Sequence, residues 1–396
     1  MTAVALAVLG VGAAACGPDA PAYDVDTSGG VPVVRNHRPQ WDDDDGWKVS
    51  RRPELSIPQW TVGDGRDTFH LADAKRLPDG TIAVANGFSG EIGVYATSGR
   101  PLRRFGGSGL EPGTFQRLRW LHVIDGALWA FDGMGRWNVF DFAGDLIATT
   151  YLEPTGGPWY RVLPYGHEVA VLASFGFPLA FEPGRQRGEA VVLRYELTGA
   201  AIDTLAVVPG REVYAHDTGR GLSMTPMPFG ALPVLHGGDR RLYYGAGDGM
   251  AIEAYREGRV ADRIFMIPQF ALPISDEEWE RETARFVALE QRYAELDPDT
   301  PTGLAARVPR PGSRPAYERF LEDFEENLWV AMYDPDHANR GLPASDRWVV
   351  FDREGRWLGS VDTPPGLAIT EIGSDYVLGI AREDDRSVVR RHTLFR

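Results

Sequence analysis

The sequence has only one cysteine, Cys16, among its 396 residues. A single thiol cannot form an intramolecular disulfide or supply the cysteine pairs of a structural zinc site. Stability must therefore come from apolar burial, for which 43% apolar residues are sufficient. Three enzyme signatures are also missing, namely Gly-x-Ser-x-Gly, His-Glu-x-x-His and the phosphate-binding loop. We therefore predict no catalytic residue, no metal ligand and no cofactor.

Positive charge and long apolar runs are also scarce. The net charge is −15, with 56 acidic residues against 41 basic ones. Such a chain repels polyanions on average, which argues against binding to nucleic acid. Beyond the N-terminus no apolar run free of charged residues, glycine and proline approaches the ~18 residues that a bilayer-spanning helix needs. The sequence therefore predicts no membrane-spanning helix.

The N-terminal segment is uncharged from residue 3 to residue 15. It is too short to span a bilayer but has the length of a secretory signal core. Residues 13–16, Ala-Ala-Ala-Cys, resemble the lipobox of bacterial lipoproteins, in which the cysteine is acylated. We expect residues 1–16 to be a signal with lipidation at Cys16, and residues 17–30 to be a tether. This predicts an exported, membrane-anchored protein on the periplasmic side, with an ordinary signal peptide or an uncleaved apolar segment as alternatives.

The chain contains a repeat, and its 46 glycines and 29 prolines suit frequent tight turns. Residues 77–105 and 123–150 follow one pattern, in which an Asp-Gly turn precedes an apolar strand, a loop, an alternating strand, a Gly turn and a last strand. Four antiparallel strands per unit are typical of a propeller blade. Weaker copies follow at residues 165–207, 239–266, 327–361 and 367–394.

We therefore predict an all-β fold, a six-bladed β-propeller over residues 31–396; five or seven blades remain alternatives because the copies are uneven. The last unit has only three strands. We expect the strand Val31–Arg35 to pair beside the strand around Val389 and complete it, which would also cover the exposed edges.

A helical insertion is expected at residues 274–326, between the fourth and fifth units. Ser275 and Glu278 form a capping box, and a helix should run from there to about Leu296. A second helical run is expected at Tyr317–Phe324. Three aromatic side chains on one face of the first helix serve either to pack it on the propeller or to dock a partner: Trp279, Phe286 and Tyr293.

Residues 106–115 resemble the linker of NHL-type repeats, in which a Gly-rich run ending in Pro-Gly-x-Phe joins two blades. The Phe-Asp-x-x-Gly pattern at Phe140 and again at Phe351 adds to this resemblance. From about Gln59 to the C-terminus, the chain is similar to bacterial six-bladed propellers of the NHL and TolB-like class. That class includes lactone hydrolases, lyases and interaction platforms, so the resemblance implies the fold but does not choose a function.

Metal-dependent lactonases of this class use Glu, Asp and Asn residues that face the channel. After the opening strands of the first unit this chain has only Asn138, Asn327 and Asn339, none on an expected innermost strand.

One set of candidate channel residues remains: Arg76, His122 and His236. Each lies six residues before an apolar residue that occupies the same place in its unit. Two imidazoles and a guanidinium could bind an anion or, with a carboxylate, a metal. The alternative is that each is a hydrogen-bonded structural residue.

We therefore expect a non-catalytic, membrane-tethered binding or scaffold propeller that engages a protein partner or an envelope membrane complex. The alternative function is a lactonase-like hydrolase or lyase acting on a small molecule in the central channel.

Overall fold

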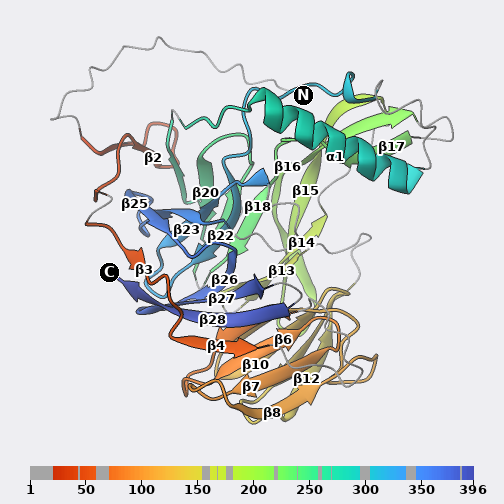
Figure 1. Ribbon diagram of the computed structural model, residues 1–396, viewed down its shortest axis with the longest axis vertical. Coiled ribbons are helices and arrows are strands. Elements are labelled where there is room, and N and C mark those ends of the chain that lie inside the picture. The colour runs from red at the N-terminus through yellow and green to blue at the C-terminus, as the bar shows by residue number, and fades with distance from the viewer. Residues whose placement is uncertain are drawn as a thin grey trace.

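The computed structural model describes most of the chain as strands, with α1 (Asp276–Ala294) as the long helix (Figure 1). The described residues are 21–42, 45–58, 71–153, 161–166, 168–174, 182–217, 222–238, 240–256, 261–268, 270–294, 304–335, 345–383 and 386–396.

The described strands form six sheets, which we number in chain order. Sheet 1 contains β5 (Leu71–Arg76), β6 (Ile82–Asn86), β7 (Glu91–Tyr95) and β8 (Pro101–Gly106). Sheet 2 contains β9 (Leu118–Ile124), β10 (Ala127–Asp132), β11 (Arg136–Phe140) and β12 (Leu146–Tyr151). Sheet 3 contains β13 (Arg161–Tyr165), β14 (Glu168–Ser174), β15 (Gly184–Tyr195), β16 (Ala201–Asp217) and β17 (Leu222–Pro226).

Sheets 4 and 6 also take up strands from the N-terminal region. Sheet 4 contains β18 (Val234–Gly237), β19 (Leu242–Gly245), β20 (Ala251–Tyr255), β21 (Arg263–Met266), β2 (Val33–Asn36) and β1 (Tyr23–Asp26). Sheet 5 contains β22 (Tyr317–Glu322), β23 (Leu328–Met332), β24 (Arg347–Phe351) and β25 (Trp357–Asp362). Sheet 6 contains β26 (Leu367–Ile372), β27 (Tyr376–Glu383), β28 (Arg386–Phe395), β4 (Leu55–Pro58) and β3 (Lys48–Val49).

The hairpin turns lie where the repeat predicts them. Asp125 and Gly126 join β9 to β10 with φ values of 48° and 77°. Positive φ at both positions suits a two-residue hairpin, because Gly adopts it without strain and Asp tolerates it. The strand that follows is almost wholly buried in both clear copies of the repeat, as the burial of β6 and β10 shows.

The hydrophobic core lies between the sheets. Five clusters of buried side chains each join two sheets that follow one another in the chain, and a sixth joins sheet 6 back to sheet 1. In that closing cluster Ile82 of sheet 1 packs with Ile380 and Val389 of sheet 6. The sheets therefore stand face to face in a closed series, and the fold is all-β and propeller-like.

The strand that completes sheet 6 is β4, not the segment Val31–Arg35. Ile57 of β4 pairs with Val389 of β28, whereas Val34 of β2 pairs in parallel with Phe265 of β21 in sheet 4. The expectation for Val31–Arg35 was wrong. Asn36 explains this register, since its side chain donates to the Gly355 carbonyl at 3.0 Å and accepts from the Trp357 N–H at 2.8 Å.

Part of the expected tether at residues 17–30 is also a strand, since β1 pairs with β2 in sheet 4. Ion pairs hold β1 in place: Arg35 lies 3.0 Å from Asp26 and 3.4 Å from Asp24. Between β2 and β3, the N–H groups of Gln40 and Trp41 each donate to the Leu358 carbonyl at 2.9 Å. Residues 21–42 and 45–58 therefore run along the outer edges of sheets 4, 5 and 6.

The capping box of α1 forms as predicted, with Ser275 N–H donating to Glu278 at 2.9 Å and Glu278 N–H to Ser275 Oγ at 3.1 Å. The prediction of a second helical run at Tyr317–Phe324 was wrong, because Tyr317–Glu322 is strand β22. A bulge beside Glu318 places Tyr317 and Phe320 in the same core cluster. This spacing of three residues imitates the helical period.

Candidate functional site

The innermost strands bring buried charges together. Asp73 of β5 is 5% exposed and accepts N–H groups from Ala74 and from Leu121 of the neighbouring sheet, both at 2.9 Å. Lys75 lies 3.7 Å from Asp73 and donates to the carbonyl of Thr370 in sheet 6. Burial raises the pKa of Asp73, although the charges of Lys75 and Arg319 oppose this effect.

Arg319 of β22 and Glu371 of β26 extend this group of charges. Burial lowers the pKa of Arg319 against the opposing charges of Asp73 and Glu318. Burial also raises the pKa of Glu371, which accepts hydrogen bonds from the Arg76 N–H at 3.2 Å and the Tyr376 hydroxyl. Two cations and two carboxylates thus connect the inner strands of sheets 1, 5 and 6. Such a set holds the sheets in register, since removing one member leaves a buried charge unpaired.

The three candidate channel residues have different partners. The guanidinium of Arg76 lies 5.0 Å from the ring centre of Tyr376. The His122 ring meets Phe131 edge-on at 5.2 Å between centroids. The His236 Nε2 accepts the N–H of Glu322 at 3.0 Å.

Strand register separates Arg76 from the two histidines. Arg76 pairs with Ile82, whereas His122 pairs with Trp129 and His236 with Tyr243, each one residue beyond the equivalent Leu128 and Leu242. A shift of one residue turns a side chain to the other face of its sheet, so equal spacing in the sequence did not give Arg76 the direction of the two histidines. Over the described residues, no three His, Cys, Asp or Glu side chains gather in a way that could hold a metal ion.

A second region of interest is an accessory unit in which α1 crosses the far ends of β16 and β17 (Figure 1). Phe286 is 5% exposed and packs with Tyr214 of β16, and Trp279 is partly buried beside them. These two aromatic side chains are committed to packing the helix, so docking would have to use other positions of α1. Tyr293 lies in the last turn of α1, and its side chain is outside the described part. The shared core contains Tyr214, Met227, Phe286, Val287, Leu304 and Val308.

A buried polar pair adds to this packing. His216 Nε2 lies 3.2 Å from a carboxylate oxygen of Glu290, and their side chains are 3% and 2% exposed. Burial lowers the pKa of His216, although the charge of Glu290 opposes this effect. The helix is therefore fixed on sheet 3 by both apolar and polar contacts.

A cavity of about 270 Å³ lies between the first turns of α1 and the ends of sheet 5. Beside it, Glu318 is 7% exposed and accepts the N–H of Asp334 at 3.4 Å. Burial raises the pKa of Glu318 to about 7. Sequence reasoning missed Glu318 because it lay in the expected helix. The lining residues are Glu278, Arg281, Arg314, Met332, Tyr333, Asp334, Pro335, Ser345, Asp346 and Arg347.

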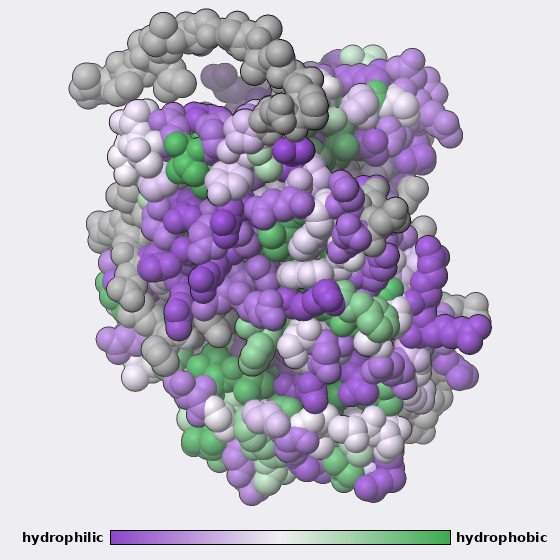
Figure 2. Space-filling model, turned by 90° about the vertical axis from the view of Figure 1, so that its left-hand side faces the viewer, coloured by the Kyte–Doolittle hydropathy of each residue, from purple (hydrophilic) through white to green (hydrophobic). Residues whose placement is uncertain are grey.

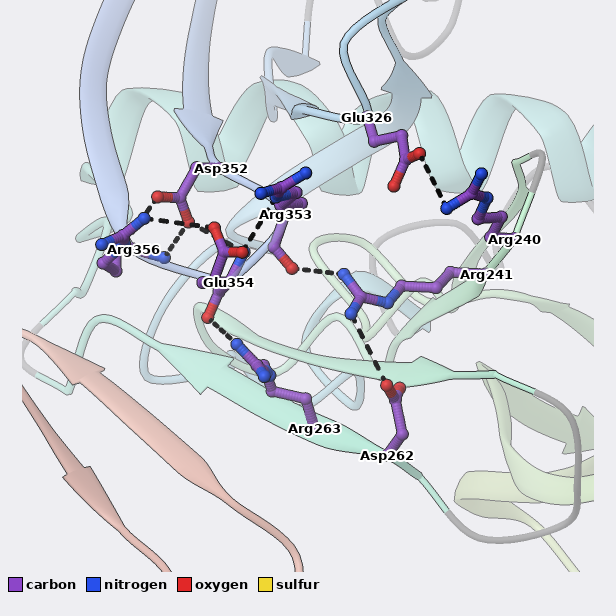
Figure 3. Close-up of polar contacts among 9 residues, drawn as sticks. All are labelled: Arg240, Arg241, Asp262, Arg263, Glu326, Asp352, Arg353, Glu354 and Arg356. Carbon is purple, nitrogen blue, oxygen red and sulfur yellow. Dashed lines mark hydrogen bonds and ion pairs between the residues drawn. The ribbon is translucent and has the colours of Figure 1, made fainter.

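A further cluster of charged side chains lies at the junction of sheets 4 and 5 (Figure 3). Arg241 donates to the Arg353 carbonyl and lies 3.6 Å from Asp262, while Arg263 donates to the Glu354 carbonyl at 2.5 Å. Carboxylates accompany the guanidinium groups throughout, as Glu354 does for Arg353 at 2.9 Å. This arrangement fastens the β24–β25 turn to sheet 4 and gives no sign of a ligand site.

Among the described residues, no helix has the length and apolar character needed to cross a membrane. No protein-family model matches the chain, and neither does any curated protein. A solved structure from the DUF4221 family of Bacteroides vulgatus is similar, with a TM-score of 0.50 and 8% identity over 88% of this chain and 98% of that chain. Identity this low shows the fold alone.

Two further solved structures align over most of their length. A Bacteroides fragilis protein described as exported has a TM-score of 0.47 and 11% identity, covering 91% of this chain and 98% of that chain. Virginiamycin B lyase from Staphylococcus aureus has a TM-score of 0.40 and 11% identity, covering 89% of this chain and 100% of that chain.

Proposed function

We propose that this chain is an exported six-bladed propeller of the NHL and TolB-like class that serves as a non-catalytic binding platform. It is tethered at the membrane through Cys16, which lies outside the described residues, and it engages a protein partner or a membrane complex. The six face-to-face sheets support the blade count. A rigid closed ring displays its surface at little cost in ordering entropy.

The accessory unit is the observation that carries the proposal. Ring closure does not need a helix with a core of its own, yet α1 is fixed on sheet 3 by both Phe286 and the His216–Glu290 pair. This packing leaves the opposite face of α1 exposed at Ala284 and Ala288, beside Leu289, which is 38% exposed. A rigidly mounted, exposed helix face is a suitable docking element for a partner.

Site-specific photocrosslinking in the producing cell tests this function. A benzophenone amino acid at Ala284 or Ala288 should give an adduct with one protein. The same group at Ser374, an exposed position in the β26–β27 turn of sheet 6, should not give that adduct. Absence of an adduct at both helix positions, or the same adduct at Ser374, would contradict docking through α1.

A second candidate function, a lactonase-like hydrolase or lyase, is favoured by Glu318. A carboxyl group with a pKa of about 7 beside a cavity has the property required of a general base at neutral pH. Arg281 and Arg314 line the same cavity and could stabilise negative charge that develops on the substrate.

Assays with lactones and esters, with and without calcium or zinc, separate the two functions. If the chain is an enzyme at this cavity, Glu318→Gln should lower kcat about 100-fold or more, while Glu253→Gln on β20 should leave it unchanged. Turnover that survives in Glu318→Gln would exclude this residue as the base. Absence of turnover in the wild-type chain would leave the binding platform as the better account.

A further inference from the structure

The outer edges of the six sheets differ in whether another segment of the chain covers them. The chain covers the fourth strand of sheet 4 with β2 and that of sheet 5 with the backbone of Gln40 and Trp41, whereas β4 is itself the outermost strand of sheet 6. The added strand β2 is four residues long and buries Val34. Addition of a short strand to an outer edge is therefore an interface that this molecule already uses.

The outer edge of sheet 2 has no such cover within the described residues, since β12 is its last strand. The sequence of β12 is Leu-Ile-Ala-Thr-Thr-Tyr, without charge or proline. Exposed edges are ordinarily protected by charged residues or proline, and β8 of the neighbouring sheet carries Pro101, Arg103 and Arg104. β12 has the composition of a covered edge although it is exposed.

The side chains around β12 are also apolar and exposed. Ile147 is 61% exposed, Tyr151 59% and Leu146 41%. Leu110, which is 65% exposed, lies in the loop that reaches Leu146 through Gly113, where a Cβ atom would be 3.4 Å from the Leu146 side chain. Figure 2 shows hydrophobic side chains gathered mainly toward the lower half of the molecule, where Figure 1 places sheets 1 and 2. Isolated exposed apolar residues are ordinary, but a cluster along an open edge marks an interaction site.

We propose that the outer edge of β12 binds an extended, uncharged segment of a partner protein, which adds to sheet 2 as a further strand. The main-chain groups of β12 supply the hydrogen bonds, and Leu110, Leu146 and Ile147 contact alternate apolar side chains of the segment. The occupant would add to the fourth strand of sheet 2 as β2 adds to the fourth strand of sheet 4 in the same ring. This inference is independent of docking through α1.

Crosslinking combined with hydrogen exchange tests the proposal on the full chain. A benzophenone amino acid at Leu110 should give an adduct with another protein. In the purified complex, the amides of residues 146–151 should exchange more slowly than in the free protein. Ile147→Lys should abolish the adduct because it places a charge on the edge. Val207→Lys is the matched control, since Val207 is 55% exposed on β16 of sheet 3, and it should leave the adduct intact.

Several outcomes would overturn the proposal. An adduct with a second copy of this chain, with light scattering showing a dimer that Ile147→Lys dissociates, would make the edge a self-association surface. An adduct without slower exchange at residues 146–151 would mean contact without strand addition. No adduct from Leu110 while Ala284 gives one would exclude the β12 edge and leave α1 docking intact. Circular dichroism of Ile147→Lys checks whether loss of the adduct results from unfolding.

Discussion

At the scale of the residue, two neighbouring charges of β22 belong to different polar clusters: Arg319 lies among the buried charges of the inner strands, and Glu318 lies beside the cavity near α1. Glu318 and Arg319 are adjacent charges in the strand Tyr317–Glu322, whose other members are mostly buried. Two adjacent charges in an apolar strand are a signal that could have located them. Because the same residues were expected to form a helix, both charges would have been assigned to its solvent-exposed face. The sequence pattern therefore did not identify them as buried.

The raised pKa of Glu318 predicts how stability depends on pH. Its pKa rises from 4.5 to about 7 on folding, so between these values the folded chain holds a proton that the unfolded chain has released. The free energy of unfolding should therefore fall as pH rises through this range, by on the order of 3 kcal/mol from this group. Urea unfolding should show that the free energy of unfolding falls less between pH 5 and pH 8 in Glu318→Gln than in the wild type.

Glu111→Gln is the matched control, because Glu111 is exposed in the linker before β9. Its loss of stability between pH 5 and pH 8 should equal that of the wild type. If Glu318→Gln also behaves as the wild type does, the carboxyl group is ionised in the folded protein at pH 5. Glu318 would then be unsuited to act as a general base with a pKa near neutrality.

At the scale of the element, period and turn chemistry predicted most strands and the start of α1. The Asp-Gly turns and the capping box are local, so the sequence alone could locate them. The pairing of an N-terminal strand with the edge of sheet 6 is not local, and two N-terminal segments had the alternating pattern of such a strand. Leu55 and Ile57 alternate with exposed residues in β4, whereas Val34 and Asn36 alternate with half-buried residues in β2. Only the tertiary partners of Asn36 decide between them.

Closure by β4 predicts a large effect of one substitution. Ile57 is 1% exposed in the cluster that joins sheets 6 and 1. Ile57→Lys should lower the free energy of unfolding by about 3 kcal/mol or more, because it removes a buried side chain and introduces a charge. Val25→Lys on β1, where Val25 is 51% exposed, should change it by less than about 0.5 kcal/mol. Equal effects in urea unfolding would contradict closure by β4.

At the scale of the whole molecule, the position of β1 limits how far the domain can stand from an anchor at Cys16. Tyr23 already belongs to sheet 4, so only residues 17–22 remain between them. Six extended residues reach about 20 Å. An acylated Cys16 would therefore hold the β1 edge of sheet 4 close to the bilayer and leave sheets 1 and 2 on the other side of the ring available to partners.

Cys16→Ser tests this arrangement. Without the acyl group the protein should move from the membrane fraction to the soluble exported fraction, because one short tether without lipid has no affinity for the bilayer. The melting temperature should not change, since the described domain begins after this residue. Ser28→Ala, a substitution at an exposed position after β1, should leave the protein in the membrane fraction. A wild-type chain that is already soluble would identify residues 1–16 as an ordinary signal peptide. Retention of Cys16→Ser in the membrane fraction would mean that another contact, and not lipid, holds the protein there.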